Sequence, residues 1–525
     1  MTNSLQSDGS GRGQRLLALA VALAYLVPAL FCLGDYGPTY DAVKGDYPYG
    51  ERVLGYLETG DERFLDLMLH EPTPRVREPH PDFDQQRWPS YWVFPVGALL
   101  SAVSCRVFWT ELGWVPSMSA HHLPFVLVAA LLVFIVTSFA RARFGRLAGV
   151  VAGGSLFLVP AFFGHSFNNP KDITECLFYT GAVLLGLRAI EGGGARAWAL
   201  AGAATGLALA QKANALFLPV QLVLFVAGLA LYARLRGERG PRLEVRALFI
   251  AALSFVGVYY AVSPAFWSAP IEGPQQWLAQ MIRVGSRAAR EHGGVPAEVS
   301  LDAPRAVLQT VPLVTLALAL LGLARPGIPF ALRWFLALSL CLPIGRNLLP
   351  GMRSFDGVRH FFEFLPMLCL LAGAGAAWLV ERAQGRAWAV ALVAGLALGP
   401  PAWAVVSTHP NQVAYFNALA GGLGTQQKRA NPDASDYWGN SYWQGMTWLS
   451  AHAEPDAKLV VLFKDFIARA GAPLVLRADI RIRNVLPTGP EDLPLWIMHL
   501  VNKGGGDFER TLDAQHAPAH AIPVQ

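Results

Sequence analysis

The chain has 525 residues, of which 53% are hydrophobic and only 15% are charged, and its mean hydropathy is +0.36. Soluble globular proteins are rarely so apolar, so the composition predicts a polytopic membrane protein and excludes an ordinary soluble domain. The formal net charge of +5 does not indicate a nucleic-acid partner, because the basic residues fall between apolar segments and form no single patch. The five cysteines lie in or beside apolar runs without a CxxC pair, so neither a metal site nor a disulfide framework is expected.

The N-terminal part begins with a polar tail, residues 1–15, followed by an apolar run at 16–33. The length of this run favours a retained membrane span over a cleaved signal peptide. Residues 35–90 are polar and form a first long loop. Residues 91–108 are moderately apolar but lie among charges and prolines, and we expect a helix that lies in the membrane interface.

Ten further apolar segments predict membrane-spanning helices, which gives about eleven with the first. They lie at approximately 121–140, 146–164, 173–190, 197–211, 214–233, 247–265, 306–324, 329–345, 361–380 and 387–407. The sequence therefore predicts an all-α membrane domain over residues 16–408, which includes the loop 35–90. Residues 409–525 are more polar and hold no span. Expected strands at 458–463, 473–482 and 493–501 make this region a small α/β domain.

Arginines occupy every second connection between the predicted spans and also the N-terminal tail. By the positive-inside rule, this side of the membrane is cytoplasmic, and an odd number of spans places the C-terminus outside. The segments expected outside are 35–90, 164–172, 265–305, 346–360 and 409–525. The unusual polar residues collect on this outer side, which disfavours a transporter, because a transporter keeps charges at the centres of its spans. Gln211 and Lys212 are an exception by position; either they face the same pocket as the outer residues or they reach towards the interface.

Residues 164–172 form a polar segment between two apolar runs. Asn169 is suited to cap the next helix, Pro170 to its first turn, and Asp172 to the third position, where free amides attract a carboxylate. Lys171 adds a cation at the positive end of this helix, so the segment predicts an anion site, most naturally for a phosphate. The alternative is an ordinary loop and cap between two membrane helices.

Three other outer segments carry residues suited to chemistry. In the first loop, an acidic residue soon after the first span is placed to take a proton from a hydroxyl; the alternative is a solvated acidic loop paired with Lys44 and Arg52. A second group fits a phosphate or, alternatively, lipid headgroups: Arg346, Arg353, Asp356, Arg359 and His360. The third suits either a sugar ring or an aromatic belt at the membrane surface: Tyr415, Asn417, Asp436, Tyr437 and Trp438.

Four motifs occur in order along the chain: Asp35-Tyr36-Gly37-x-Thr39-x-Asp41, Phe163-Gly164-His165 through Asp172, Arg353-x-x-Asp356-Gly357-Val358-Arg359-His360-Phe361, and His409-Pro410 with Tyr415-Phe416-Asn417 and Asp436-Tyr437-Trp438-Gly439-x-Ser441-Tyr442. Taken together, they resemble a bacterial branch of the C-type (GT-C) glycosyltransferases, the superfamily of protein O-mannosyltransferases and aminoarabinose transferases. The resemblance implies a GT-C fold in the bacterial inner membrane, with a cytoplasmic N-terminus and an extracytoplasmic C-terminus.

The resemblance also implies an activity. Such an enzyme moves a hexosyl or pentosyl group, with inversion, from a polyprenyl-phosphate donor to a hydroxyl of a lipid, glycan or protein. No cofactor is required, although a non-essential divalent cation is compatible. Membrane lipids surround the protein, and no nucleic acid takes part. Two other readings remain open, a lipid or solute transporter and a GT-C-like scaffold without activity.

The same resemblance assigns roles to residues. Asp41 matches the catalytic Asp of an Asp-Glu pair, but the second position here is Ala42, so that Asp35 or Asp46 would have to supply another carboxylate. The donor phosphate is assigned to Lys171, Arg359, His360 and Arg353. Supporting roles fall to Asp172, Asn169, His165 and Asp46. The acceptor or sugar side is assigned to Tyr415, Asn417, Asp436, Tyr437 and Trp438.

Overall fold

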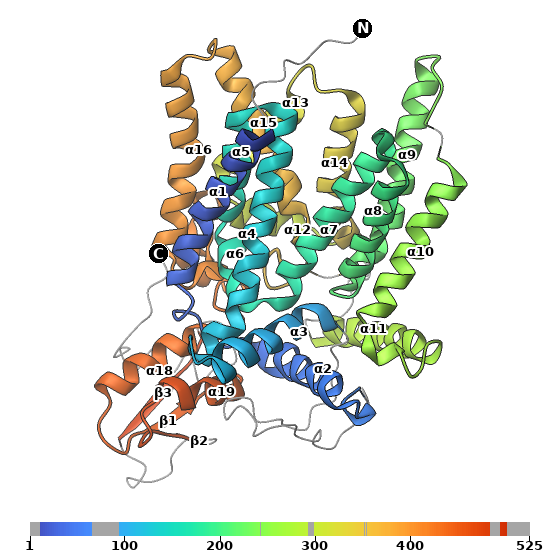
Figure 1. Cartoon of the computed structure of the whole chain (residues 1–525). Helices are drawn as coiled ribbons and strands as arrows, with labels where there is room; N and C mark the ends of the chain where they lie inside the picture. Colours follow the sequence, from blue (N-terminus) through green and yellow to red (C-terminus); the bar gives the residue numbers. More distant parts are fainter. Residues whose placement is uncertain are drawn as a thin grey trace.

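A bundle of apolar helices makes up most of the computed structural model, and a small sheet lies at one end of it (Figure 1). The structure describes residues 11–65, 94–241, 243–291, 299–350, 352, 354–483 and 494–500. Its first ten helices are α1 Gly11–Phe31, α2 Tyr47–Thr59, α3 Pro95–Ser104, α4 Ser117–Phe144, α5 Arg146–Phe157, α6 Pro160–Asn168, α7 Pro170–Arg188, α8 Gly194–Leu209, α9 Leu218–Leu235 and α10 Val245–Ala261. The later helices are α11 Glu272–Glu291, α12 Asp302–Thr310, α13 Leu313–Ala324, α14 Phe330–Gly345, α15 Phe364–Arg382, α16 Ala387–Ser407, α17 Gly422–Lys428, α18 Ser441–His452 and α19 Asp465–Val475.

Each predicted span contains a helix of the bundle: α1, α4, α5 with α6, α7, α8, α9, α10, α12 with α13, α14, α15 and α16. The prediction of an all-α polytopic membrane protein is therefore confirmed. By length and composition, five apolar stretches of the described chain are long enough to cross a membrane, or seven if each of two bent helix pairs forms one span. The count of eleven crossings remains a prediction, because helices such as α8 and α14 are shorter than the roughly 20 residues that a full span needs.

The bundle is packed closely around α15, most of whose residues are buried. Where α13 crosses α15, Gly322 faces Gly375, and a Cβ added at either glycine would lie about 2 Å from a backbone oxygen of the other helix. Small residues at such a crossing let two membrane helices approach closely. The resulting van der Waals contacts hold the helices together in lipid, where the hydrophobic effect does not. A larger side chain at either glycine would therefore force α13 and α15 apart.

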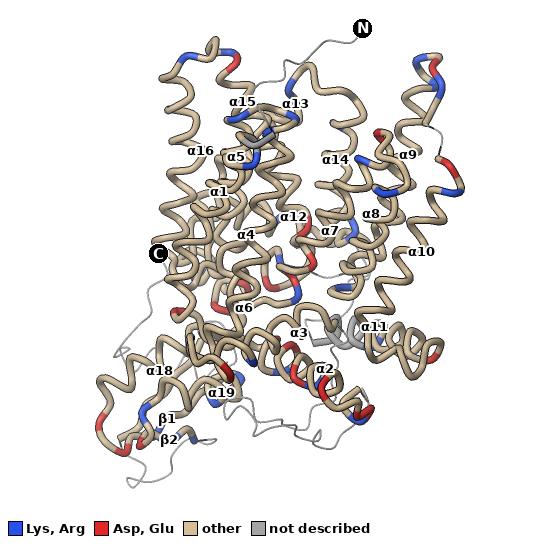
Figure 2. The backbone as a smooth tube through the Cα atoms, viewed as in Figure 1, with Lys and Arg blue, Asp and Glu red and all other residues tan. Residues whose placement is uncertain are grey.

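The two ends of the bundle differ. Figure 1 shows α2, α3 and α11 lying across one end, beside α18, α19 and the strands, and we call this the domain end. Figure 2 shows lysines and arginines at the opposite end, in the connections between long helices, and a mixed group of acidic and basic residues inside the bundle. A helix was expected at 91–108, and α3 with the π-helical turn Cys105–Glu111 occupies this position. Neither α2 nor α11 was predicted.

The C-terminal region contains a three-stranded parallel sheet of β1 Lys458–Val461, β2 Arg481–Arg483 and β3 Leu495–Met498, in the order β2-β1-β3. The first and third strands lie within the predicted ranges. The predicted strand 473–482 is wrong over most of its length, because α19 extends to Val475 and β2 starts only at Arg481. The burial of Ile467, Ala468 and Gly471 on one side explains the helix, since these positions share a helical face.

Candidate active site

The first outer loop carries Asp41 into the interior of the protein. The hydroxyl of Thr39 donates to the carbonyl of Asn168 at 3.2 Å, and the N–H of Tyr40 donates to the carbonyl of Trp438 at 3.0 Å. The loop is thus tied both to the end of α6 and to the C-terminal region. Asp41 follows directly and begins the π-helical turn Ala42–Asp46, which leads into α2, and its side chain is buried.

The junction of α6 and α7 has the predicted cap. The Oδ1 atom of Asn169 accepts the N–H of Asp172 at 3.0 Å, and its Nδ2 atom donates to Oδ2 of Asp172 at 2.7 Å. Pro170 is the first residue of α7. His165 Nδ1 lies 3.1 Å from the same Nδ2 atom, so the imidazole also contacts the cap. This geometry fixes Asp172 and places Lys171 at the helix N-terminus.

Two cations contact Asp41. Lys171 Nζ lies 3.3 Å and Arg359 Nη1 lies 3.2 Å from Oδ2 of Asp41. Arg359 also binds Asp356 through Nη2 at 2.7 Å, and its Nη1 atom is 3.9 Å from Asp172. The guanidinium group therefore joins three carboxylates that come from three separate parts of the chain.

Lys212 completes this group. Its Nζ atom lies 2.7 Å from Oδ1 of Asp172 and donates to the carbonyl of Arg359 at 3.0 Å. The sequence left two readings open for Lys212, and the structure places it inside. We call Asp41, Lys171, Asp172, Lys212, Asp356 and Arg359 the charged cluster. It contains three carboxylates and three cations, so its formal charge is zero.

The electrostatic surroundings differ between the two acidic residues of the π-helical turn. Burial by itself would raise the pKa of Asp41, but the adjacent Lys171 and Arg359 bring that pKa below its ordinary value. For Asp46, burial dominates and raises the pKa to about 7. Its Oδ2 atom is buried and has no hydrogen-bond partner in the described part of the chain.

Arg359 stays charged despite its burial. Burial would lower the pKa of its guanidinium group, but Asp356 and the other carboxylates raise that pKa above its ordinary value.

The segment Asp436-Tyr437-Trp438 brings two aromatic residues to the cluster. The ring of Trp438 lies 4.8 Å from Cζ of Arg359, and its edge-on contact with His165 has a centroid distance of 4.9 Å. The hydroxyl of Tyr437 is 3.3 Å from His165 Nε2. The carboxylate of Asp436 accepts the backbone N–H groups of Trp438 and Gly439 at 3.1 Å, so it shapes the turn that carries these rings.

Several predicted site residues lie elsewhere. Asn417 donates to the carbonyls of Leu308 and Val311, each at 2.8 Å, and so fastens the C-terminal region to α12. Tyr415 is half-buried, and its backbone N–H donates to Gln412. The ring of His360 packs edge-on against Phe355. Burial keeps the pKa of His360 well below its ordinary value, so the imidazole is neutral. Arg353 lies outside the described residues.

Position 42, where the motif resemblance implies a Glu, is apolar in this chain. Ala42 is fully buried and packs with Tyr47, Met118 and Ala470. Of the two carboxylates that were candidates to replace it, Asp35 is half-exposed and pairs with His409 Nε2 at 2.9 Å. Asp46 is the one that the structure buries in the same turn as Asp41.

A further buried ion pair adjoins the cluster. Arg346 Nη1 lies 2.6 Å from Oε1 of Glu363, and Asn214 donates to the carbonyl of His360 and to Oε2 of Glu363. Glu175, one turn into α7 from Asp172, is also fully buried, and neither of its carboxylate oxygens has a hydrogen-bond partner among the described residues. Neither Glu175 nor Glu363 was among the predicted site residues; their only signal in the sequence was a charge within or beside an apolar run.

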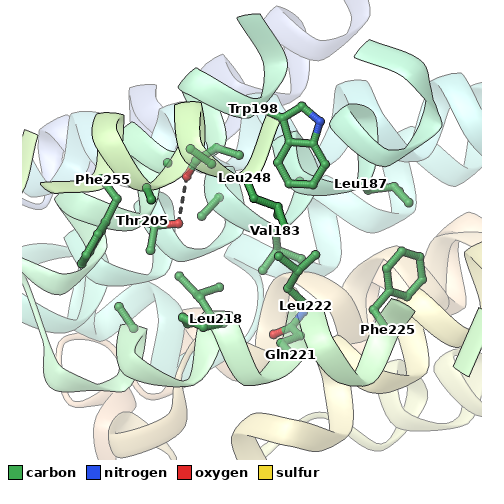
Figure 3. A pocket seen from close by; sticks show the side chains of 18 of the residues that line it. Val183, Leu187, Trp198, Thr205, Leu218, Gln221, Leu222, Phe225, Leu248 and Phe255 are labelled. Carbon is green, nitrogen blue, oxygen red and sulfur yellow. Dashed lines mark hydrogen bonds between the residues drawn. The ribbon is translucent and has the colours of Figure 1, made fainter. Parts of the chain in front are cut away.

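Two cavities reach this region. The first has a volume of about 310 Å³ and is lined almost entirely by apolar side chains of α7, α8, α9 and α10, among them Val183, Leu187, Leu222 and Phe225 (Figure 3). The second has a volume of about 740 Å³ and a mixed polar lining from α12, residues 354–357 and the C-terminal region. Asp356 and Tyr437 line this second cavity, which therefore borders the charged cluster.

One group of side chains outside the cluster brings three possible metal-ligand atoms close together. Among the described residues, only Cys32, Asp35 and His409 form a group of three whose possible ligand atoms lie within 4.8 Å of one another. All five cysteines are free thiols. This group joins the end of α1 to the start of the C-terminal region, and Asp35 already pairs with His409 there.

Comparison with known proteins gives a class for this fold. The sequence model of the family described as dolichyl-phosphate-mannose-protein mannosyltransferase matches residues 95–259. Among solved structures, the crystal structure of ArnT from Cupriavidus metallidurans in the apo state matches with a TM-score of 0.51 and 15% sequence identity, over 91% of this chain and 87% of that chain. No curated protein matches.

The shared fold covers nearly the whole chain, whereas the family match is confined to the segment from α3 to α10. Together they identify a membrane protein with the GT-C fold. The resemblance of the motifs to the GT-C superfamily is therefore supported by the shared fold and by the family match over residues 95–259.

Proposed function

We propose that the protein transfers a sugar from a polyprenyl-phosphate donor to an acceptor hydroxyl at the domain end of the bundle. The observation that carries this proposal is the buried carboxylate of Asp41 held between Lys171 and Arg359, at 3.3 and 3.2 Å. A carboxylate beside two cations supplies a proton acceptor next to a phosphate site. These are the two groups that displacement of a phosphate from a sugar requires.

The proposed reaction is a single displacement with inversion. The acceptor oxygen forms a bond to the anomeric carbon while the bond from that carbon to the phosphate oxygen breaks. The acceptor proton goes to the carboxylate of Asp41, and the bonding electrons leave with the polyprenyl phosphate. Lys171 and Arg359 then stabilise the negative charge that grows on the departing phosphate.

The phosphate site is built from rigid elements. Lys171 stands at the N-terminus of α7, whose free N–H groups and dipole favour an anion. Lys212 and Asn169 hold Asp172 in place through contacts of 2.7 Å each, so Asp172 is a positioning residue. Arg359 offers a planar fork that fits phosphate oxygens.

The apolar cavity supports a donor that carries a lipid chain. Leu209 and Ala215 line it on either side of the segment that bears Lys212, so it approaches the charged cluster at that point. Its wall then runs along α7 and α8 to Leu187 and Trp198 (Figure 3). A prenyl chain seated there would leave its phosphate near Lys212 and Lys171, within reach of Asp41.

The arginines at the end opposite the domain end support a membrane orientation for this protein. By the positive-inside rule, we propose that this end and the N-terminus lie on the cytoplasmic side of a bacterial inner membrane. Transfer at the domain end is then extracytoplasmic. We propose no metal cofactor for this reaction, and chelation by EDTA should leave the rate unchanged.

The test uses purified protein, radiolabelled polyprenyl-phosphate hexoses and pentoses, and a membrane extract as the source of acceptors. Asp41→Asn should lower the transfer rate by about 10²–10⁴-fold while the protein stays folded. The matched control is Glu62→Gln, which removes an exposed carboxylate from the same loop and should transfer normally. Unchanged turnover in Asp41→Asn would remove Asp41 from the mechanism.

The same preparation separates the alternatives. Flux of a lipid or solute across vesicles without any sugar transfer would favour a transporter. Binding of a donor without transfer, in protein that is folded, would favour a scaffold without activity. Identification of the labelled product would give the sugar and the acceptor.

A further inference from the structure

The ends of two apolar helices bring a thiol, a carboxylate and an imidazole together outside the charged cluster. Cys32 directly follows α1, and the N–H of Asp35 donates to the carbonyl of Cys32 at 3.1 Å. His409 lies just after α16, 374 positions from Asp35 in the sequence. One possible ligand atom of each side chain lies within 4.8 Å of the other two. Because only the fold brings these residues together, the spacing of the cysteines along the chain could not predict the group.

The imidazole of His409 is oriented so that its Nε2 atom faces this group. Nε2 lies 2.9 Å from Oδ2 of Asp35, whereas Nδ1 lies 3.3 Å from the hydroxyl of Tyr36. That hydroxyl donates its own proton to Oε1 of Gln412 at 2.7 Å, so its oxygen is able to accept a proton from Nδ1. Nε2 of Gln412 is 3.2 Å from Nδ1 as well, but it has an acceptor in the carbonyl of Val405. Histidines that bind a metal are usually oriented in this way, by a hydrogen bond from the second ring nitrogen.

The support behind His409 is itself well fixed. Tyr36 is 1% exposed, and its ring stacks on that of Phe167 with a centroid distance of 3.9 Å. The ring of Tyr36 also meets the imidazole edge-on, with centroids 5.5 Å apart. The position of Nε2 is therefore set by packing as well as by hydrogen bonds.

The three side chains form a donor set that suits zinc. Thiolate, imidazole and carboxylate are the ligands that Zn²⁺ takes in proteins, at about 2.0–2.3 Å from the ion, so that tetrahedral ligands lie roughly 3–4 Å apart. A spacing of at most 4.8 Å reaches this arrangement by a small contraction. A thiolate and a carboxylate together balance the two positive charges of the ion. Calcium and magnesium fit less well, because they prefer oxygen ligands alone.

The group is also accessible to an ion from solution. The side chain of Asp35 is 51% exposed and that of His409 is 27% exposed, while Cys32 is half-buried. A fourth position on the ion can therefore be filled by water. Such a site has one closed side, which holds the ligands, and one open side, through which the ion enters.

We propose that Cys32, Asp35 and His409 bind a zinc ion, which fastens the end of α1 to the start of the C-terminal region. On binding, the thiol of Cys32 releases its proton to the solvent and its sulfur bonds to the ion. The neutral imidazole keeps its one proton on Nδ1, where the oxygen of Tyr36 accepts it, and Nε2 bonds to the ion. The carboxylate of Asp35 supplies the third bond.

The role of this ion is structural. Hydrogen bonds already join the same two parts of the chain: the indole of Trp443 donates to the carbonyl of Gly34 at 3.1 Å, and the N–H of Gly37 donates to Oδ1 of Asn440 at 2.9 Å. Zinc adds a stronger link at the beginning of the loop that carries Asp41. None of the three ligands belongs to the charged cluster, so removal of the ion should lower the stability and leave the transfer chemistry without a metal requirement.

A zinc titration tests the site directly. Full-length protein without an affinity tag is purified in detergent, treated with EDTA, and titrated with Zn²⁺ in competition with a zinc indicator. The parent should bind one ion per chain. Cys32→Ser and His409→Gln should each weaken binding by more than about 100-fold, since loss of an outer partner alone costs about 10–100-fold, the range expected for Tyr36→Phe. Cys341→Ser is the matched control, because it removes an exposed cysteine of α14 and should bind normally.

Cobalt gives a second test, which needs no variant that has to fold. Co²⁺ occupies zinc sites, and its bond to a thiolate gives a charge-transfer band in the near ultraviolet that nitrogen and oxygen ligands do not give. The parent protein should show this band, and zinc should abolish it by displacing the cobalt. Absence of the band in the parent, or its persistence in Cys32→Ser, would overturn the assignment of the ligands.

Thermal unfolding tests the structural role. Zinc at 100 times its Kd should raise the Tm of the parent by about 3 °C, whereas Cys32→Ser should show no such rise. Zinc binding without any rise in Tm would overturn the fastening role. If Asp35 and His409 form only an ion pair, the parent will bind no zinc and His409→Gln will lower Tm equally in zinc and in EDTA, which would overturn the site. None of these measurements uses sugar transfer, so the zinc site stands or fails independently of the proposed function.

Discussion

Asp46 gives the sharpest test of the electrostatics of the site. Its carboxyl group is 2% exposed and its Oδ2 atom has no hydrogen-bond partner among the described residues. Burial raises its pKa from the ordinary 3.8 to about 7. The folded protein therefore binds a proton that the unfolded chain has lost between these two values, and the free energy of unfolding falls as the pH rises through this window.

The size of the effect follows from the shifted pKa. A rise from 3.8 to about 7 corresponds to about 4 kcal/mol in full, of which about 3 kcal/mol is lost between pH 5 and pH 8. Asp46→Asn carries no charge at any pH, so it avoids this loss. For a chain of this length, one kcal/mol shifts Tm by about 1 °C. The difference in Tm between the variant and the parent should therefore be about 3 °C more favourable to the variant at pH 8 than at pH 5.

The assay is thermal unfolding in detergent, followed by tryptophan fluorescence at both pH values. Glu62→Gln serves as the control, because it removes an exposed carboxyl group near the same helix and should show no such gain. An equal difference between Asp46→Asn and the parent at the two pH values would show that Asp46 is ionised throughout. Burial would then not be what controls the charge of Asp46.

Two further predictions concern residues around the cluster. Lys212→Met removes the cation that lies 2.7 Å from Asp172 and leaves a buried carboxylate without enough positive charge around it. We expect the free energy of unfolding to fall by about 3–5 kcal/mol, measured as a lower Tm. The double variant Lys212→Met/Asp172→Leu should largely restore the Tm. Asn417→Ala removes two hydrogen bonds to backbone carbonyls of α12 and its C-terminal end and should cost about 1–3 kcal/mol in stability. If Asn417 instead contacts the substrate, its variant will raise the KM for donor or acceptor while Tm stays the same.

Local patterns in the sequence predicted local structure well. The spacing of Asn169, Pro170 and Asp172 predicted a capped helix with Lys171 at its end, and the structure has this cap with both hydrogen bonds formed. The apolar segments likewise predicted the helices of the bundle. Both features depend on residues within one or two helical turns, where side-chain and backbone chemistry decides the conformation.

The parts that the sequence did not predict depend on tertiary contacts. Lys212 and Asp172 are far apart in sequence and meet only because α7 packs against α8. Asp46 is buried because the π-helical turn carries it inwards, and periodicity alone does not indicate such a turn. The helix α19 replaced a predicted strand because short apolar runs fit both structures, and its packing against α18 decides between them.

The charge balance of the cluster explains how a carboxylate with a lowered pKa can act as a base. In the donor-free state, Asp41, Asp172 and Asp356 balance Lys171, Lys212 and Arg359, and Asp41 is held by two of these cations. A polyprenyl-phosphate sugar would bring one negative charge and share Lys171 and Arg359 with Asp41. The added negative charge and the sharing of these two cations would each raise the pKa of Asp41 towards or above its ordinary value.

The other two carboxylates are less free to respond, because Asp172 is fixed by Lys212 and Asn169, and Asp356 by two bonds from Arg359. In the proposed mechanism, the additional proton affinity would therefore fall on Asp41 when the donor is present. Ala42 would then not disable the site, since the donor phosphate would convert Asp41 from an ion-pair partner into a proton acceptor.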